Sequence, residues 1–218
     1  MIERALLQAL IIWQKDARHK PLLLRGARQV GKTSLVTQFG KTHFKYFVNI
    51  NLELETGYHA CFEGLNPAEI CNAIAVISGQ EIIPGETLLF FDEIQECPKA
   101  IRSLRYFKEQ LPKLHVIAAG SLLELSLQAA DYRMPVGRVS SLYLKPLSFK
   151  EFLQAFNTEA VLAIENATLA KPLSLSVHQY LLKQLKLYML LGGMPEVVSH
   201  YLEKETIWEL LEVEKLIG

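Results

Sequence analysis

The sequence has few cysteines, no excess of charge of either sign and no long uninterrupted hydrophobic run. Its three cysteines, Cys61, Cys71 and Cys97, are odd in number and lack C-x-x-C spacing, which favours reduced thiols over a disulfide framework. Lys plus Arg and Asp plus Glu number 23 each, so the overall charge indicates neither a nucleic-acid partner nor an anionic membrane, although a local basic groove stays open. No apolar stretch approaches the length of a membrane-spanning helix. We therefore expect a soluble, cytoplasmic protein without a membrane partner.

Half of the residues are hydrophobic, which is enough to build a packed core. Segments with strand character alternate with helical segments over the first two thirds of the chain, an order typical of a parallel sheet with helices on both faces. The predicted strands are residues 21–25, 44–52, 87–91, 114–120 and 140–144. The predicted helices are an amphipathic N-terminal one, with Ile2, Leu6, Leu10, Trp13 and Ala17 on one face, and others near 34–39, 67–77 and 98–110.

From Ser148 onward the pattern contains only helices. A long helical segment ends at Gly192-Gly193, and a last helix begins at Pro195. We therefore predict an α/β core over residues 1–147, followed by a smaller all-helical region over 148–218. The final residues still show a helical pattern, so we expect the natural chain to continue past Gly218.

Residues 26–33 match the phosphate-binding pattern G-x-x-x-x-G-K-[ST], between a predicted strand and a predicted helix as the pattern requires. Glycine lets the backbone bend and bring its N–H groups up to phosphate oxygens, and the helix start adds free N–H donors. We expect Lys32 to reach the β- and γ-phosphates and the Thr33 hydroxyl to bind Mg²⁺. The alternative interpretation is an ordinary glycine turn. The residues predicted to bind the nucleotide are Gly26, Ala27, Arg28, Gln29, Val30, Gly31, Lys32, Thr33 and Ser34.

Two adjacent carboxylates, Asp92 and Glu93, follow the apolar strand at 87–91. The carboxyl ends of parallel strands meet at the sheet edge where ligands bind, so both side chains are expected to face the phosphate-binding loop. Asp92 is predicted to hold Mg²⁺, directly or through water, and Glu93 to act as the general base for the attacking water. The alternative is a strand end that meets solvent.

Ser121 follows the strand predicted at 114–120. Its hydroxyl is placed to bond the attacking water or the γ-phosphate. It equally fits the cap of a helix that begins at Leu122, because Glu124 three residues later completes a capping-box pattern. Both roles are compatible with each other.

Two arginines, Arg133 and Arg138, lie in a turn-rich loop before the last predicted strand. An arginine on the γ-phosphate stabilises the charge of the transition state, within its own chain or across a subunit boundary. The alternative for both is an ordinary surface arginine. No arginine follows Arg138, so the helical region offers only lysine or histidine to a bound nucleotide.

Taken together, these motifs resemble one family. They are Gly26 to Thr33, Asp92-Glu93-Ile94-Gln95, Ser121, Gly137-Arg138, the segment from Lys145 to Phe152, and Gly192 to Pro195. The family is that of the prokaryotic AAA+-like P-loop ATPases, in which the ATPase core precedes an uncharacterised, sometimes restriction-endonuclease-like C-terminal domain. The resemblance implies an α/β core with a five-stranded parallel sheet and a helical lid. It also implies a Walker A motif from Gly26 to Thr33, a Walker B motif at Asp92 and Glu93, a sensor-like Ser121 and a Gly-Arg element at Arg138.

The first functional hypothesis is an Mg²⁺-dependent ATPase that couples ATP binding and hydrolysis to conformational change, with Lys32, Glu93, Ser121 and Arg138 as its catalytic residues. The second is a nucleotide-gated signalling or interaction module with negligible turnover. A small-molecule phosphotransferase is less favoured because no separate substrate-base motif occurs, and the absence of an N-K-x-D motif argues against a GTPase. Action of Arg138 across a boundary requires a homo-oligomer.

Overall fold

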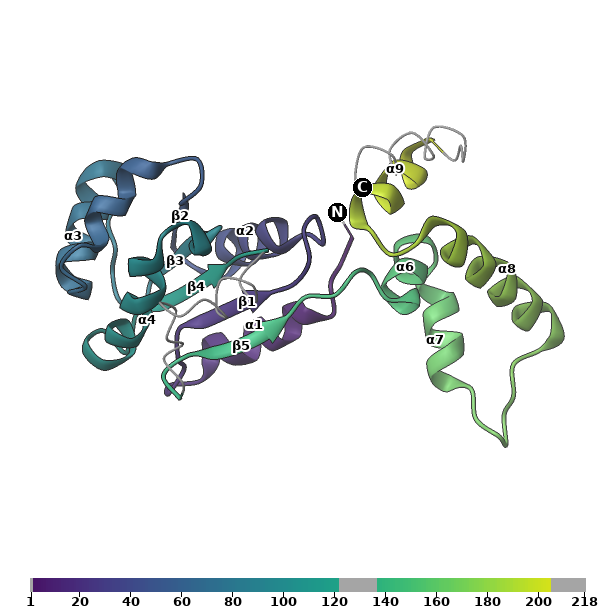
Figure 1. The fold of residues 1–218 in the computed structure, drawn as a ribbon. Coiled ribbons are helices and arrows are strands. Elements are labelled where there is room, and N and C mark those ends of the chain that lie inside the picture. The colour runs from purple at the N-terminus through teal and green to yellow at the C-terminus, as the bar shows by residue number, and fades with distance from the viewer. Residues whose placement is uncertain (1, 122–136, 205–218) are drawn as a thin grey trace. The chain divides into compact units, whose positions relative to one another are not determined.

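The structure is a computed structural model that describes residues 2–121 and 137–204 (Figure 1). The chain divides into two compact units: Leu6–Leu144, and Met1–Ala5 together with Lys145–Gly218. We refer to them as the α/β unit and the helical unit. The prediction placed residues 1–5 in the core, whereas in the structure they group with the helical unit. The cause is that Arg4 and Ala5 bond the side chain of Glu151, and that Ile2 packs against the apolar cluster of α6, α8 and α9.

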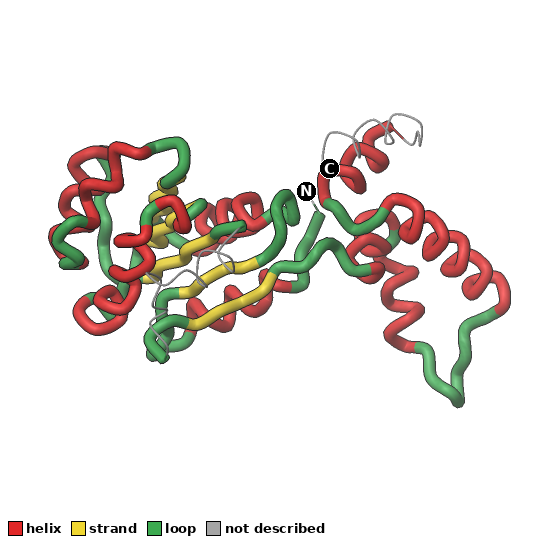
Figure 2. The backbone as a smooth tube through the Cα atoms, in the orientation of Figure 1, coloured by secondary structure: helices red, strands yellow, loops and turns green. Residues whose placement is uncertain are grey.

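The α/β unit is built on a five-stranded parallel sheet in the order β2-β3-β4-β1-β5, which confirms the predicted fold class. Figure 2 shows the strands of this sheet in yellow. Its strands are β1 (Leu22–Arg25), β2 (Tyr46–Asn51), β3 (Thr87–Asp92), β4 (His115–Ala119) and β5 (Ser140–Tyr143). Every residue of β3 and β4 is buried, as expected for inner strands of a parallel sheet, whereas the edge strand β5 alternates between partly buried and exposed residues. The carboxyl ends of all strands therefore lie at one edge.

Helices cover both faces of this sheet. Along β3, Leu89 and Phe91 belong to the apolar cluster formed with α3, α4 and the 3₁₀ helix η1. The alternate residue Phe90 stacks on Phe47 instead, on the side where Phe47 also approaches Gly40 of α2. The helical elements are α1 (Leu6–Lys15), α2 (Lys32–His43), η1 (Thr56–Phe62), α3 (Pro67–Ser78), η2 (Ile94–Glu96) and α4 (Pro98–Gln110).

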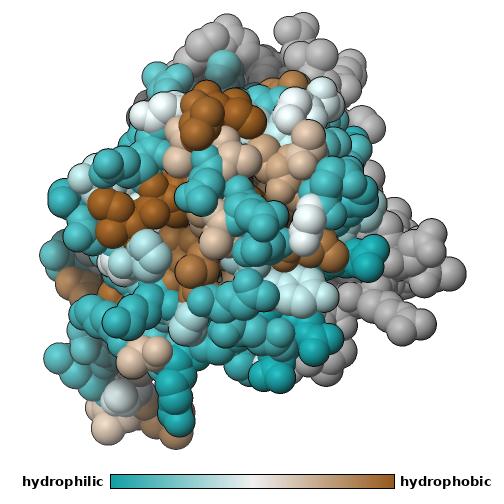
Figure 3. All heavy atoms as spheres, turned by 90° about the vertical axis from the view of Figure 1, so that its left-hand side faces the viewer, coloured by the Kyte–Doolittle hydropathy of each residue, from teal (hydrophilic) through white to brown (hydrophobic). Residues whose placement is uncertain are grey.

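One helix start shows how the local sequence shapes this unit. Pro67 opens α3 after Asn66, whose side-chain oxygen accepts a hydrogen bond from the Ala68 N–H at 3.0 Å. The N-terminal helix α1 is shorter than predicted: it spans Leu6–Lys15 and does not include Ile2 and Ala17. Figure 3 shows the α/β unit from the side of α3, where hydrophobic side chains are scattered among hydrophilic ones.

The helical unit contains α6 (Phe149–Phe156), α7 (Thr158–Asn166), α8 (Leu175–Leu191) and α9 (Pro195–Lys204) among its described residues. The cap of α6 is a capping box between Ser148 and Glu151. The long helix α8 ends at Gly192, as predicted, and Gly193 approaches the Leu147 carbonyl so closely that an added Cβ would lie 2.5 Å from its oxygen. No helix within residues 2–121 and 137–204 is both long and apolar enough to cross a membrane.

Candidate nucleotide-binding site

The loop between β1 and α2 has the conformation that only glycine adopts readily at two of its positions. Gly26 has a φ of 147°, and a Cβ there would lie 2.2 Å from the carbonyl oxygen of Leu144. Gly31 precedes α2 with a φ of 89°, and no side chain caps the helix start. The first-turn N–H groups of α2 are thus left to an anion, which is the arrangement that binds phosphate in this kind of loop. The loop therefore fits a nucleotide triphosphate tail.

Lys32 is the first residue of α2, two positions before the predicted helix start, and only 6% of it is exposed. Its Nζ donates hydrogen bonds to the carbonyl oxygens of Gly26 at 2.9 Å and Ala27 at 2.7 Å. Burial lowers the pKa of Lys32, and the nearby carboxylates of Glu93 and Asp92 partly offset this effect. The ammonium group is consequently held inside the loop, where phosphate oxygens would replace its carbonyl partners.

Thr33 and Asp92, the two predicted Mg²⁺ ligands, are brought into direct contact. Thr33 Oγ1 donates to Asp92 Oδ2 at 2.6 Å, and the Glu93 N–H donates to Asp92 Oδ1 at 3.1 Å. Asp92 is buried, and burial raises its pKa while the hydrogen bond from Thr33 opposes the rise. A hydroxyl and a carboxylate are hard oxygen ligands of the kind that Mg²⁺ prefers, so this pair fits the ion.

Glu93 and Ser121 also meet, although 28 residues separate them in the chain. Ser121 follows β4, which is the neighbour of β3 in the sheet. Its Oγ and its N–H donate to Glu93 Oε2 at 3.3 Å and 3.4 Å. The helix that Ser121 was predicted to cap, together with Glu124 and Arg133, lies outside the described residues.

Sequence reasoning missed Gln95 as a member of this group. Its Nε2 donates to Glu93 Oε2 at 2.7 Å from within η2. The only signal in the sequence was its place two residues after Glu93, in a segment that carried the family resemblance. No general rule assigns a function to a glutamine at that spacing.

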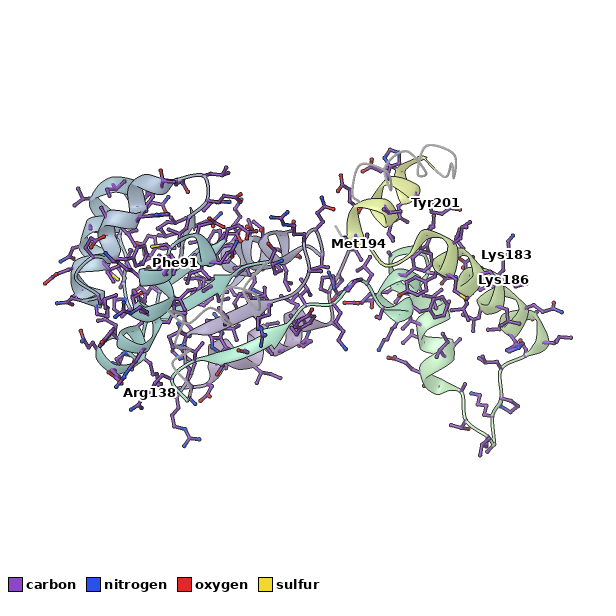
Figure 4. All side chains as sticks on the ribbon, in the orientation of Figure 1. Phe91, Arg138, Lys183, Lys186, Met194 and Tyr201 are labelled. Carbon is purple, nitrogen blue, oxygen red and sulfur yellow. The ribbon has the colours of Figure 1, made fainter. Side chains whose placement is uncertain are left out.

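Arg138 does not join these residues. It precedes β5, whose first residue, Ser140, pairs with Leu22 at the amino end of β1, whereas the phosphate-binding loop leaves the carboxyl end of β1. Arg138 Nε lies 3.3 Å from Glu109 Oε1, near the end of α4, and its side chain points away from the sheet (Figure 4). The structure thus places Arg138 at the amino edge of the sheet, whereas Lys32, Asp92 and Glu93 lie at the carboxyl edge.

Three comparisons place this geometry among known proteins. Residues 18–153 match the family model of an AAA domain. The uncharacterized protein MJ1544 of Methanocaldococcus jannaschii is 28% identical over 198 residues, which cover 89% of this chain and 40% of that protein. The Walker-type ATPase PABY2304 of Pyrococcus abyssi superposes with a TM-score of 0.58 at 19% identity, covering 100% of this chain and 73% of that one.

These matches differ in what they establish. The chain spans less than half the length of its curated relative. The likeness to the solved structure shows a shared fold, and the family model covers more than half of the chain and includes the loop, Asp92, Glu93 and Ser121. The chain belongs to the AAA domain family, an AAA+-like family of P-loop ATPases.

Proposed function

We propose that this chain is an Mg²⁺-dependent ATPase that couples nucleotide binding and hydrolysis to conformational change. The observation that carries the proposal is the convergence of four side chains at the carboxyl edge of the sheet. The Lys32 ammonium group lies in the loop, Thr33 bonds Asp92, and Glu93 follows directly after the end of β3. These neighbouring side chains comprise a phosphate-binding cation, a pair of metal ligands and a general base.

Each residue has a distinct task in this proposal. The loop N–H groups and Lys32 bind the phosphates, and Thr33 and Asp92 hold Mg²⁺, which supplies positive charge to the phosphate oxygens. Glu93 orients the attacking water and takes its proton as the water oxygen bonds to the γ-phosphorus and the bond to ADP breaks. Ser121 bonds the carboxylate of Glu93. ADP and inorganic phosphate are the products.

The coupling is supported by contacts within the α/β unit. Gly26 lies against the carbonyl of Leu144, and the Leu144 N–H donates to the Arg25 carbonyl at 2.8 Å. Leu144 is the last residue before the chain enters the helical unit. A nucleotide that reshapes the loop therefore acts next to the residue where the α/β unit ends. We propose that residues 145–218 serve as the lid and Leu6–Leu144 as the core.

Arg138 acts across a subunit boundary in this proposal. Within its own chain it would have to pass from one edge of the sheet to the other to reach the γ-phosphate, and it is paired there with Glu109. In a homo-oligomer, the amino edge of one subunit's sheet would lie against the phosphate-binding loop of its neighbour, so that Arg138 reaches the γ-phosphate there. The oligomer is part of the proposal.

The central test compares two site variants with a matched lysine control. We expect Lys32→Ala to weaken ATP binding at least about tenfold, since it removes the buried phosphate-binding cation. We expect Glu93→Gln to bind ATP normally but to release phosphate about 100-fold more slowly, because only the base is lost. Lys41→Ala, an exposed position on the same helix α2, should change neither quantity.

Calorimetry and steady-state phosphate release measure these effects. Normal binding in Lys32→Ala, or an unchanged rate in Glu93→Gln, would remove the basis of the proposal. Mixing Arg138→Ala with Lys32→Ala tests the subunit boundary: the first keeps a competent loop and the second a competent arginine. Activity in the mixture, where each variant alone is inactive, is the expected result, and a mixture as inactive as its parts would contradict it.

The position of Arg138 also favours the second candidate, a nucleotide-gated module with negligible turnover. A chain whose own Arg138 lies at the far edge of the sheet would bind nucleotide without hydrolysing it while it remains alone. The two candidates differ in how specific activity depends on protein concentration. An ATPase completed by a neighbour gains activity per chain as concentration rises, whereas a gated module shows binding and no turnover at any concentration.

A further inference from the structure

Two residues, Ser121 and Gln95, donate hydrogen bonds to the carboxylate of Glu93. Gln95 is only 9% exposed, and its Nε2 lies 2.7 Å from Glu93 Oε2. That contact is shorter than the 3.3 Å and 3.4 Å contacts from Ser121 to the same oxygen. Three donors thus converge on Oε2, and Gln95 provides the closest of them. Within the part of the chain that the structure describes, no hydrogen bond involves Glu93 Oε1.

The backbone explains why Gln95 reaches this oxygen. Glu93 adopts a left-handed conformation with a φ of 48°, uncommon for a residue with a side chain, and it precedes the single turn η2. The turn is closed by the Glu96 N–H, which donates to the Glu93 carbonyl at 3.1 Å. This conformation turns the chain back on itself after β3, so the side chain of Gln95 returns toward that of Glu93.

We propose that Gln95 is a positioning residue for Glu93: it binds Oε2 so that Oε1 is the oxygen that receives the proton of the attacking water. The inference rests on the proposed ATPase function. A glutamate side chain that is not anchored samples several rotamers, and small displacements of a reacting group lower a rate strongly. Anchoring one carboxylate oxygen through a buried amide restricts both the position and the rotation of the other.

The decisive variant is Gln95→Met, which keeps an unbranched side chain of similar length and removes the amide, and with it the hydrogen bonds from Nε2 to Glu93 Oε2 and Glu96 Oε1. We expect kcat to fall about tenfold or more, since the base is no longer held in one orientation. The dissociation constant for ATP, measured by calorimetry, should stay within about twofold, because no loop residue is changed. The matched control is Gln110→Met at the exposed end of α4, where both quantities should stay at the wild-type value.

A double-mutant cycle separates positioning from a general structural role. If Gln95 acts through Glu93, then Gln95→Met has no further effect on the residual rate of a Glu93→Gln protein. A merely structural role predicts that the two losses multiply and that ATP affinity falls as well. Either of these results would overturn the inference.

A second variant covers the case in which Gln95→Met does not fold. Gln95→Glu preserves size and polarity but places an acceptor against Glu93, and we expect at least as large a loss of kcat. Wild-type kcat in either folded variant would contradict the inference. The outcome is distinguishable from failure of the proposed function: an unchanged rate in Glu93→Gln removes the base itself, whereas an inactive Glu93→Gln beside a fully active Gln95→Met removes only the role of Gln95.

Discussion

The α/β unit and the helical unit achieve burial in different ways. In the α/β unit all residues of β3 and β4 are buried, and the aromatic rings of Phe62, Phe91 and Phe107 pack together between the sheet and its helices. Large apolar side chains are exposed in both units, for example Val76 and Met189, but the helical unit has the smaller apolar clusters and places a buried ion pair, Arg4–Glu151, where its segments meet. The proposed catalytic groups all lie on the α/β unit, which has the larger apolar cluster. Groups that stand at strand ends and helix starts are held more precisely than groups on loops.

Removing a buried ring from the core of the α/β unit should destabilise that unit most. Phe91 is fully buried, and its ring centroid lies 5.3 Å from that of Phe62 (its position is labelled in Figure 4). We expect Phe91→Ala to lower the free energy of unfolding by about 3–5 kcal/mol, because it removes a large apolar side chain and leaves a cavity. Denaturant unfolding measures the loss, and hydrogen exchange shows where protection falls. Phe156→Ala, a partly buried position in α6, is the counterpart and should lower protection in the helical unit only; equal losses in both units from either variant would contradict their independence.

A smaller effect concerns the pH dependence of the α/β unit. His115 begins β4, is stacked on His19 with ring centroids 3.9 Å apart, and has its pKa lowered to about 4 by burial and by the neighbouring imidazole of His19. The unfolded chain, with a histidine pKa near 6.5, binds more protons than the folded one between about pH 4 and 6.5. Stability is therefore complete above pH 6.5 and is lost as the pH falls to 4, by about 2–3 kcal/mol.

Unfolding at a series of pH values checks this expectation. His115→Phe keeps an aromatic ring on His19 and should flatten the dependence between pH 4 and 6.5. His178→Phe, at an exposed position of α8, should leave it as steep as in the wild type. A wild-type protein equally stable at pH 4.5 and 6.5 would show that the pair does not contribute.

The helical unit depends to a lesser degree on the buried carboxylate of Glu151. Glu151 accepts hydrogen bonds from Arg4 Nε at 3.0 Å, the Ala5 N–H at 2.9 Å and the Ser148 N–H at 2.8 Å. Burial alone would raise the pKa of Glu151, but these hydrogen bonds and the charge of Arg4 together lower it. We expect Glu151→Gln to lower the free energy of unfolding of the helical unit by about 1–2 kcal/mol at neutral pH, since charge-assisted hydrogen bonds are lost.

The sign of the pH dependence follows from the lowered pKa. The contribution of Glu151 is complete above the unfolded value near 4.3 and is lost as the pH falls through the folded pKa, so wild type and variant should converge in acid. Hydrogen exchange in peptides from α6 to α9 measures the difference. Glu165→Gln, which changes an exposed partner of Lys150, should cost only about 0–1 kcal/mol. A Glu165 effect equal to that of Glu151 would contradict the importance of burial.

The order and type of most elements were predictable because they depend on local patterns. Buried runs such as 87–91 and the helix start at Asn66-Pro67 carry their structure in a few neighbouring residues, and the structure shows them with small shifts at their ends. The membership of residues 1–5 was not predictable, since it depends on the contact of Arg4 with Glu151 across 147 positions of sequence. Local pattern contains no information about a pair so far apart.

The phosphate-binding loop follows from its local sequence, because its two glycines and the adjoining helix start act within a few residues of one another. The placement of Asp92 and Glu93 at the carboxyl end of a buried strand is also a local property. Which groups contact these carboxylates depends on the tertiary fold. The strand order sets β4 beside β3 and so brings Ser121 to Glu93, the turn after β3 brings Gln95 to the same oxygen, and the parallel pairing of β5 with β1 sends Arg138 to the opposite edge. The physical reason is that strand order and register arise from packing over the whole sheet, whereas a loop motif arises from the backbone freedom of its own residues.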